Sequence, residues 1–494
     1  MSDKYESQRK ELLYKPTNGY HILPDAEKPA LEAYSQRYIA FLNAAKTERE
    51  AVKEAIRQAE AKGFVPFTPG MDLAPGTKVY QAVHRKAINL AVIGQKSLSE
   101  GTRIAAAHID NPRLDLKPNP LYEEDGMAFF QTHYYGGIKK YQWTTVPMSI
   151  HGVIVKRDGE VVDVCVGEKD EDPVFIVTDL LIHLAAEQLE KKAAKVIEGE
   201  ALDIIVGNKP LVIGKDAEDG KNEKKKGKKD KKEAAKDAVK AGILQILKEN
   251  YDMEEEDFIS AELEVVPAGK AREAGFDRSM ILSYGQDDRV CAYTSLQAML
   301  DLPKQTGRTV CCILVDKEEI GSVGATGMQS KFFENAVAEV MNLCGEYSEL
   351  ALRRCLAHSC MLSSDVSSAY DPSYAASFDK KNVAYLGGGM VFNKFTGARG
   401  KSGSNDANAE YIAHIRKIFA QEKINFQTAE LGKVDLGGGG TIAYILALYG
   451  MNVIDSGVPV LSMHAPWEAT SKADLYEAYR GYMAFLRGME LQNI

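Results

Sequence analysis

VDKEEIG at residues 315–321 places two adjacent carboxylates, Glu318 and Glu319, directly after an apolar run. The run is TVCCILV at 309–315, and it is typical of a buried strand. A strand that ends in this way delivers two acids to one rim of a sheet. At that rim one carboxylate can bind a metal ion while its neighbour handles a proton. The segment therefore indicates a metal-dependent site at the edge of a sheet.

Other residues of the types that bind metals occupy similar settings along the chain. They are His108 and Asp110 at the end of the apolar run 104–107, Asp287 and Asp288 before another apolar run, Asp365 after 361–364, and His464 after 458–463. The order along the chain is His-x-Asp, Asp, Glu-Glu, Asp, His. That order is the pattern of a two-metal hydrolase.

Hydrolysis of a peptide near pH 7 needs a hydroxide-like nucleophile, a polarised carbonyl and a proton shuttle. Two metal ions roughly 3.5–4 Å apart can supply the first two. Two His, two Asp and one Glu suffice as ligands if one carboxylate bridges the ions. Asp110 stands two residues after His108, so on a strand both side chains share a face and Asp110 can fix the imidazole tautomer. Two points stay open: Asp287 or Asp288 could bridge, and Asp365 could instead cap a helix.

The motifs around these residues resemble those of the aspartyl aminopeptidase family of metallopeptidases. The matching stretches are HIDNPRL at 108–114, DKEEIGS at 316–322, DVSSAYDPSY at 365–374 and SMH at 462–464. The likeness covers nearly the whole chain, and the motifs follow the family's order. It implies an α/β fold, with a three-layer α/β/α peptidase domain and an inserted β-rich dimerisation domain.

The resemblance also implies a role for each site residue. His108 and Asp365 would hold one divalent ion, Glu319 and His464 the other, with Asp287 bridging, Glu318 as general base and Lys394 binding substrate. Two ions per subunit are expected, with zinc as the default and cobalt or manganese able to support activity. The implied activity is that of an aminopeptidase that uses a metal-bridged water to release N-terminal residues, acidic ones (Asp or Glu) among them, from short peptides.

One stretch departs from the family pattern. In TDLLIH at 178–183, Asp179 stands where the family has a histidine that reaches a neighbouring subunit's site. The departure argues against a strict acidic preference and keeps a neutral, Leu- or Met-type specificity as the alternative. A deacylase or carboxypeptidase on the same fold would need an arginine to bind the substrate carboxylate. The only candidates for that arginine near the predicted metal ligands are Arg289 and Arg399. The complete ligand set and Glu318 argue against a non-catalytic assembly protein.

Composition limits the partners and the location. The net charge of −9 and the pI near 5.7 argue against a nucleic-acid partner, for which a basic surface is expected. No stretch approaches the apolar length of a membrane helix. The start, MSDKYESQRK, lacks the apolar core of a signal peptide, and the seven cysteines include no Cys-x-x-Cys pair. A cytoplasmic location with reduced thiols is therefore expected.

The expected elements change in character along the chain. Residues 28–62 have helical spacing, and the hairpin signal KRDG at 156–159 belongs to a strand-rich stretch that begins at about 121. The lysine-rich segment 215–236 is expected to be a disordered loop, since it cannot bury apolar area. Strands and helices alternate past about 272, which predicts an α/β/α sheet.

These changes give the domain plan. The peptidase domain is predicted to be discontinuous, over 1–120 and 273–494, and the inserted domain spans 121–272. The resemblance implies that the inserted domain forms dimers, and that dimers build a large closed homo-oligomer, a dodecamer.

Overall fold

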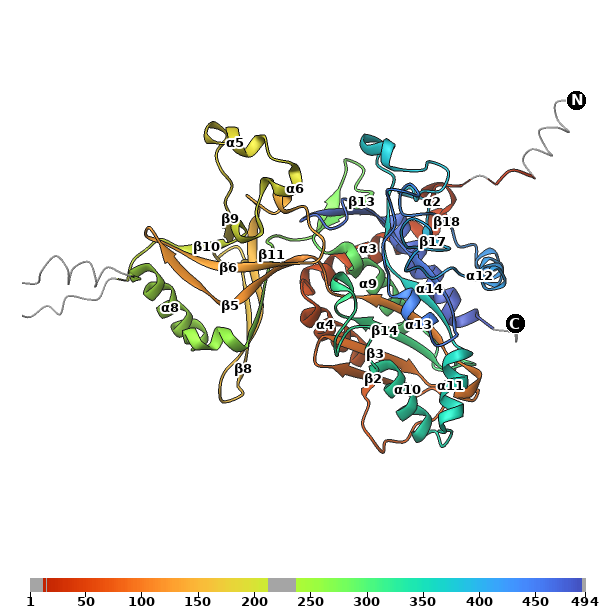
Figure 1. Ribbon diagram of the computed structural model, residues 1–494. Coiled ribbons are helices and arrows are strands. Elements are labelled where there is room, and N and C mark those ends of the chain that lie inside the picture. Colours follow the sequence, from red (N-terminus) through yellow and green to blue (C-terminus); the bar gives the residue numbers. More distant parts are fainter. Residues whose placement is uncertain (1–11, 15, 212–236, 491–494) are drawn as a thin grey trace, which may run out of the picture. The chain divides into compact units, whose positions relative to one another are not determined.

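The computed structural model describes residues 12–14, 16–211 and 237–490. The predicted lysine-rich loop, 215–236, lies outside this described part. The chain divides into two compact units, Met1–Asn111 with Ala271–Ile494 and Pro112–Lys270 (Figure 1). Within the described residues, no helix has the length and apolar character that a membrane span needs.

A nine-stranded sheet forms the centre of the first unit. In spatial order its strands are β1 (Val65–Pro66), β2 (Lys78–Val83), β3 (Ala87–Val92), β14 (Val310–Val315), β4 (Arg103–His108), β15 (Cys360–Ser364), β19 (Asn452–Gly457), β17 (Met390–Asn393) and β18 (Phe426–Thr428). β14, β4, β15 and β19 run parallel, with Val315 level with His108 and Ser364 level with Ser456. Their carboxyl ends therefore meet at one edge of the sheet.

Helices cover both faces of this sheet, because the side chains of each strand alternate between two cores. On β14, Cys312 and Leu314 join one core, and Cys311 and Ile313 join the other. Helices α3 (Lys28–Ala44), α4 (Glu48–Ala61), α9 (Gln286–Leu300), α12 (Ala409–Glu422) and α14 (Lys472–Gly488) contribute to the first core, and α10 (Phe332–Leu343), α11 (Glu349–Ala357) and α13 (Ala443–Ala447) to the second. The unit is a three-layer α/β/α sandwich, as the sequence predicts.

The helical spacing over 28–62 corresponds to two helices rather than one. α3 ends at Ala44 and α4 begins at Glu48. Between them, the hydroxyl of Thr47 accepts the N–H of Glu50 at 3.3 Å, and the Glu50 carboxylate accepts the N–H of Thr47 at 3.1 Å. This reciprocal capping box starts a new helix, and its Thr-x-x-Glu signature is readable in the sequence.

A smaller, five-stranded sheet lies within the same unit. Its strands, in order, are β12 (Arg272–Ala274), β13 (Met280–Ser283), β21 (Glu468–Ser471), β20 (Pro459–Leu461) and β16 (Ser367–Ser368). β21 pairs antiparallel with both β13 and β20. The carboxyl ends of β13 and β20 therefore meet beside the first residue of β21, Glu468.

The second unit is built on a seven-stranded sheet. Its strands are β11 (Ala261–Pro267), β5 (Arg113–Glu124), β6 (Met127–Tyr135), β10 (Ile204–Gly207), β9 (Phe175–Val177), β7 (Pro147–Val155) and β8 (Val161–Val166), with β11 also paired to β7. Among its helices are α5 (Ala186–Leu189), α6 (Ala193–Val196) and α8 (Ala238–Tyr251). The predicted hairpin turn is present, since the N–H of Gly159 bonds to the carbonyl of Lys156. The unit includes β5, whose residues from Arg113 already pair with β6, so it starts before position 121.

Candidate metal centre

The nine-stranded sheet carries four of the predicted site residues at its carboxyl edge. His108 is the last residue of β4, and Asp365 directly follows β15. Glu318 and Glu319 lie in a short 3-10 turn that follows β14. Because β4, β14 and β15 are parallel neighbours, these side chains come together although the sequence separates them widely.

The five-stranded sheet supplies two more. Asp287 lies at the start of α9, just after β13, and His464 follows β20. Asp287 is located between the two histidines: its Oδ1 is 3.2 Å from Nε2 of His108, and its Oδ2 is 3.1 Å from Nε2 of His464. Asp365 Oδ1 is 4.0 Å from His108 Nε2, and Glu319 Oε2 is 3.6 Å from His464 Nε2. Two groups of three potential ligands thus share Asp287.

Glu318 belongs to a third group, together with His108 and Glu319. Within each of the three groups one ligand atom per residue lies within 4.8 Å of the others. The structure therefore brings six of the predicted residues into one cluster, which we call the metal centre: His108, Asp287, Glu318, Glu319, Asp365 and His464.

Asp110 is buried behind this cluster. Nδ1 of His108 lies 3.0 Å from the main-chain carbonyl of Asp110 and 3.4 Å from its carboxylate, so Nδ1 carries the hydrogen and Nε2 remains for a cation. The two oxygens of the Asp110 carboxylate accept the N–H groups of Glu318 at 3.1 Å and Glu319 at 3.2 Å. The sequence predicts the contact with the imidazole but not the hydrogen bonds to the backbone N–H groups of Glu318 and Glu319.

Burial and crowding shift the protonation of the centre. Burial raises the pKa of Glu318 to about 7, with Asp287 pushing in the same direction and His108 opposing. Burial likewise raises the pKa values of Glu319 and Asp365 well above their ordinary range. For Asp287, burial alone would raise the pKa, but hydrogen bonds from the two facing imidazoles lower it below its ordinary value.

This donor set fits divalent cations. Several buried carboxyls around two imidazoles are an unfavourable arrangement unless positive charge compensates them. Oε1 of Glu319 is buried and has no hydrogen-bond partner within the described ranges. Imidazole nitrogens and carboxylate oxygens are ordinary zinc ligands. His108 and Asp365 would serve one ion, and Glu319 and His464 a second.

Asp288 occupies a different position from its neighbour. It is fully buried, it belongs to none of the ligand groups found among the described residues, and its Oδ2 lies 3.4 Å from the N–H of His108. Burial raises its pKa well above the ordinary range. Of the adjacent pair, Asp287 is the one whose carboxylate faces both histidines.

Lys394 lies apart from the cluster. β17 runs antiparallel to β19, with Val391 level with Gly457 and Asn393 level with Asp455. The chain beyond Asn393 therefore runs away from the edge that carries the metal centre, by about 3.3 Å per residue.

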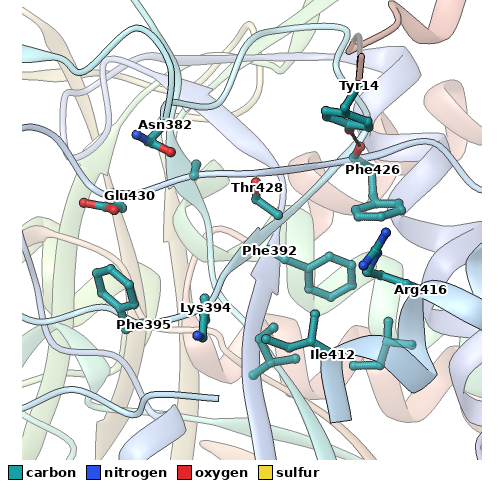
Figure 2. A pocket seen from close by; sticks show the side chains of 13 residues that line it. Tyr14, Asn382, Phe392, Lys394, Phe395, Ile412, Arg416, Phe426, Thr428 and Glu430 are labelled. Carbon is teal, nitrogen blue, oxygen red and sulfur yellow. Dashed lines mark hydrogen bonds between the residues drawn. The ribbon is translucent and has the colours of Figure 1, made fainter. Parts of the chain in front are cut away.

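Lys394 faces a pocket of about 470 Å³ that Phe392, Ile412 and Phe426 also line, and none of the six residues of the metal centre lines it (Figure 2). Its substrate-binding role stays a prediction. The two candidate arginines also differ: Arg289 is buried and donates to the carbonyl of Lys46 at 2.6 Å, whereas Arg399 is exposed.

The sequence interpretation missed Glu468. This carboxylate is 1% exposed, and it accepts the main-chain N–H groups of two predicted ligands, Asp287 and His464, and of Gln286. The one signal in the sequence is a glutamate four residues after His464, at the start of a strand.

The family model described as "Aminopeptidase I zinc metalloprotease (M18)" matches residues 41–486. The chain is 57% identical, over 480 residues, to a probable M18 family aminopeptidase 1 of Clostridium acetobutylicum, which covers 96% of this chain and 99% of that protein.

Solved structures similar to this chain include aminopeptidases of the same family. An M18 family aminopeptidase from Thermotoga maritima matches with a TM-score of 0.88 and 42% identity, covering 97% of this chain and 100% of that one. Aminopeptidase I of C. acetobutylicum matches with a TM-score of 0.85 and 55% identity, covering 96% and 100%. The S. cerevisiae mApe1 dodecamer shares the fold at 19% identity, with a TM-score of 0.72 over 93% and 97% of the two chains. On the family match and the identities to these relatives, the chain belongs to the M18 family of zinc metalloaminopeptidases.

Proposed function

We propose that this metalloaminopeptidase binds two divalent ions at its metal centre, His108 and Asp365 holding one, Glu319 and His464 the other, and Asp287 both. One observation carries the proposal: the two oxygens of Asp287 face different imidazoles, at 3.2 and 3.1 Å. A carboxylate placed in this way can serve two ions at once. Zinc is the expected metal, because imidazole and carboxylate ligands suit it, and cobalt or manganese can occupy such a site.

Glu318 is the proposed general base. When bound, the two ions would polarise the scissile carbonyl and make a water molecule acidic. Glu318 is not needed as a ligand, so its carboxylate is available to take the proton of that water and to deliver it to the leaving amine. Asp110 supports this role because it holds the backbone N–H groups of Glu318 and Glu319.

Two measurements test the assignment. Elemental analysis should find two divalent ions per subunit in the intact protein, and His108→Ala and His464→Ala should each lose at least one. A substrate with a free amino terminus should be cleaved, and its N-acetylated form should not. Fewer than two ions in the intact protein, or unchanged stoichiometry in both variants, would contradict the two-ion centre.

The preference for the first residue is a separate proposal. An acidic preference rests on Lys394 pairing with Asp or Glu by charge. Lys394 lies three residues beyond the level of the sheet edge that carries the ligands, which favours the neutral alternative. Asp179, at the position where the family has a histidine, favours the same alternative. A panel of dipeptides with Asp, Glu, Leu or Met first decides between the two, since faster cleavage after Asp and Glu would restore the acidic preference.

We also propose a large homo-oligomer that admits short peptides. The fold is shared with the S. cerevisiae mApe1 dodecamer, and the second unit exposes apolar side chains suited to pairing with another copy. A dodecamer built from dimers is the proposed form. A cytoplasmic location suits the seven cysteines, all of which are free thiols.

A further inference from the structure

The carboxylate of Glu468 contacts the main chain on both sides of the metal centre. Its Oε2 accepts the N–H of Gln286 at 2.6 Å and that of Asp287 at 3.1 Å. Its Oε1 accepts the N–H of His464 at 2.8 Å. One buried side chain thus holds the backbone of two residues whose own side chains face each other across 3.1 Å.

Strand order explains how a single residue reaches both. β21 begins at Glu468 and lies between β13 and β20, which lead into Asp287 and His464 respectively. The side chain of Gln286 completes the arrangement, since its amide donates to the main-chain carbonyls of Glu468 at 2.7 Å and of Ile281 at 3.0 Å. The first residue of β21 therefore contacts both loops that carry the ligands, the one with Asp287 and the one with His464.

The backbone on the histidine side needs such support. Ser462 and His464 both adopt positive φ angles, 60° and 67°, a region that residues other than glycine rarely occupy. The turn is closed by a bond from the N–H of Ala465 to the carbonyl of Ser462, at 2.9 Å, and by the bond from His464 to Glu468. This conformation directs the imidazole toward Asp287.

We propose that Glu468 is a positioning residue that fixes Asp287 and His464 relative to each other and so determines the affinity of the ion site formed by Asp287, Glu319 and His464. Glu468 acts through the backbone and is not itself a ligand. The carboxyl group offers two acceptor oxygens, and both are used: Oε2 by two N–H groups and Oε1 by one, whereas the amide of glutamine has a single acceptor oxygen. The inference rests on the proposed two-ion centre.

Glu468→Gln tests it, with Asp474→Asn as the matched control. The substitution keeps the size of the side chain but turns an amide N–H₂ toward a backbone N–H. Asp474 is also a buried carboxylate, and it accepts the N–H groups of Gly387 and Gly389 at 2.7 Å each, so its variant loses comparable bonds. Calorimetric titration of the metal-free, full-length proteins with zinc chloride measures the affinity of each site.

We expect Glu468→Gln to weaken one of the two zinc sites by roughly 10–100-fold, the usual effect of removing a group that orients a ligand. Asp474→Asn should lower the melting temperature yet bind both ions as the intact protein does. With cobalt instead of zinc, Glu468→Gln should alter the visible absorption spectrum, which reports ligand geometry. Wild-type affinity in Glu468→Gln, or an equal loss in Asp474→Asn, would overturn the proposal.

The outcome is separable from the two-ion assignment, because fewer than two ions in the intact protein contradicts that assignment alone. If circular dichroism shows that Glu468→Gln does not fold, Glu468→Asp takes its place. Its shorter carboxylate cannot reach all three N–H groups, so the same weakening is expected, and unchanged zinc affinity in Glu468→Asp would equally overturn the inference.

Discussion

Glu318 and Glu319 are adjacent in sequence but are predicted to do different work. Both are held by Asp110 through their N–H groups, yet only Glu319 joins the ligand group of Asp287 and His464. We expect Glu318→Gln to reduce turnover by roughly 10²–10⁴, the scale of general acid–base catalysis, because it removes the base and keeps the size. Metal analysis alongside kinetics checks the assignment. If Glu318→Gln lost metal while Glu319→Gln kept it, the two roles would be reversed.

Asp110→Asn should act on metal binding as well as on rate. An amide has one acceptor oxygen in place of two, so one of the two N–H groups of the Glu-Glu turn would face an N–H₂ group. We expect metal affinity or activity to fall by about 10–100-fold. Asp115→Asn is the control, since its carboxylate pairs with Arg113 outside the metal centre. Equal zinc affinity and equal activity in Asp110→Asn and the intact protein would contradict this role.

The sequence locates a candidate site residue where its type and its strand-end position coincide. His108, Asp365 and the Glu-Glu pair stand at strand ends in the sequence, and the structure brings them together with Asp287 and His464. Glu468 gave no comparable signal, because its partner Gln286 is 182 residues away and the contact exists only in the folded sheet. Lys394 illustrates a second limit of the sequence. A basic residue near a strand end is a candidate site residue, but its distance from the ligand edge depends on the direction of β17, which the sequence alone does not give.

At the scale of elements, the sequence predicts β14 as a strand but gives no break in the helical pattern over 28–62. The apolar run 309–315 predicts a buried strand, and in the structure its residues divide between two cores. The break between α3 and α4 depends on Thr47 and Glu50, whose capping box interrupts an otherwise continuous helical pattern. The second unit begins at Pro112, whereas the change of character in the sequence places the boundary at about 121; the Asn-Pro turn signal at 111–112, directly before β5, marks the earlier position.

Thr47→Ala should destabilise the helix pair. The hydroxyl of Thr47 satisfies an N–H at the start of α4 that has no partner within the helix, and loss of an N-cap costs about 1 kcal/mol. A lower urea midpoint with an unchanged slope measures this. Thr68→Ala, at an exposed threonine outside any helix, is the control and should leave the midpoint in place. A Thr47→Ala midpoint equal to that of the control would show that the box contributes nothing.

Metal removal is a test at the scale of the whole molecule. Without ions, burial opposes charge on Glu319 and Asp365, so folding must accommodate either repulsion or bound protons. Ions that bind only the folded chain add about 4 kcal/mol of stability when their free concentration exceeds Kd a thousandfold. We expect a chelator to lower the melting temperature and added zinc to restore it. A melting temperature that is insensitive to both treatments would contradict a metal centre coupled to folding.

Assembly is the remaining property of the whole molecule, and the second unit offers the surface for it. Leu180, Leu181, Ile182 and Leu184 are 48–66% exposed in the single chain, a run of apolar side chains that a monomer would leave in water. If they are buried between copies, each contributes about 1.5–3 kcal/mol, so replacing two of them with charged residues should weaken pairing more than a hundredfold.

We therefore expect light scattering to report a particle far larger than the 54.3 kDa chain, and the double variant Leu181→Glu with Ile182→Glu to report a smaller one. Leu448→Glu, at an 80% exposed leucine of the first unit, is the matched control and should keep the large particle. A monomeric intact protein would refute the assembly, whereas a large particle in both variants would move the interface away from 180–184.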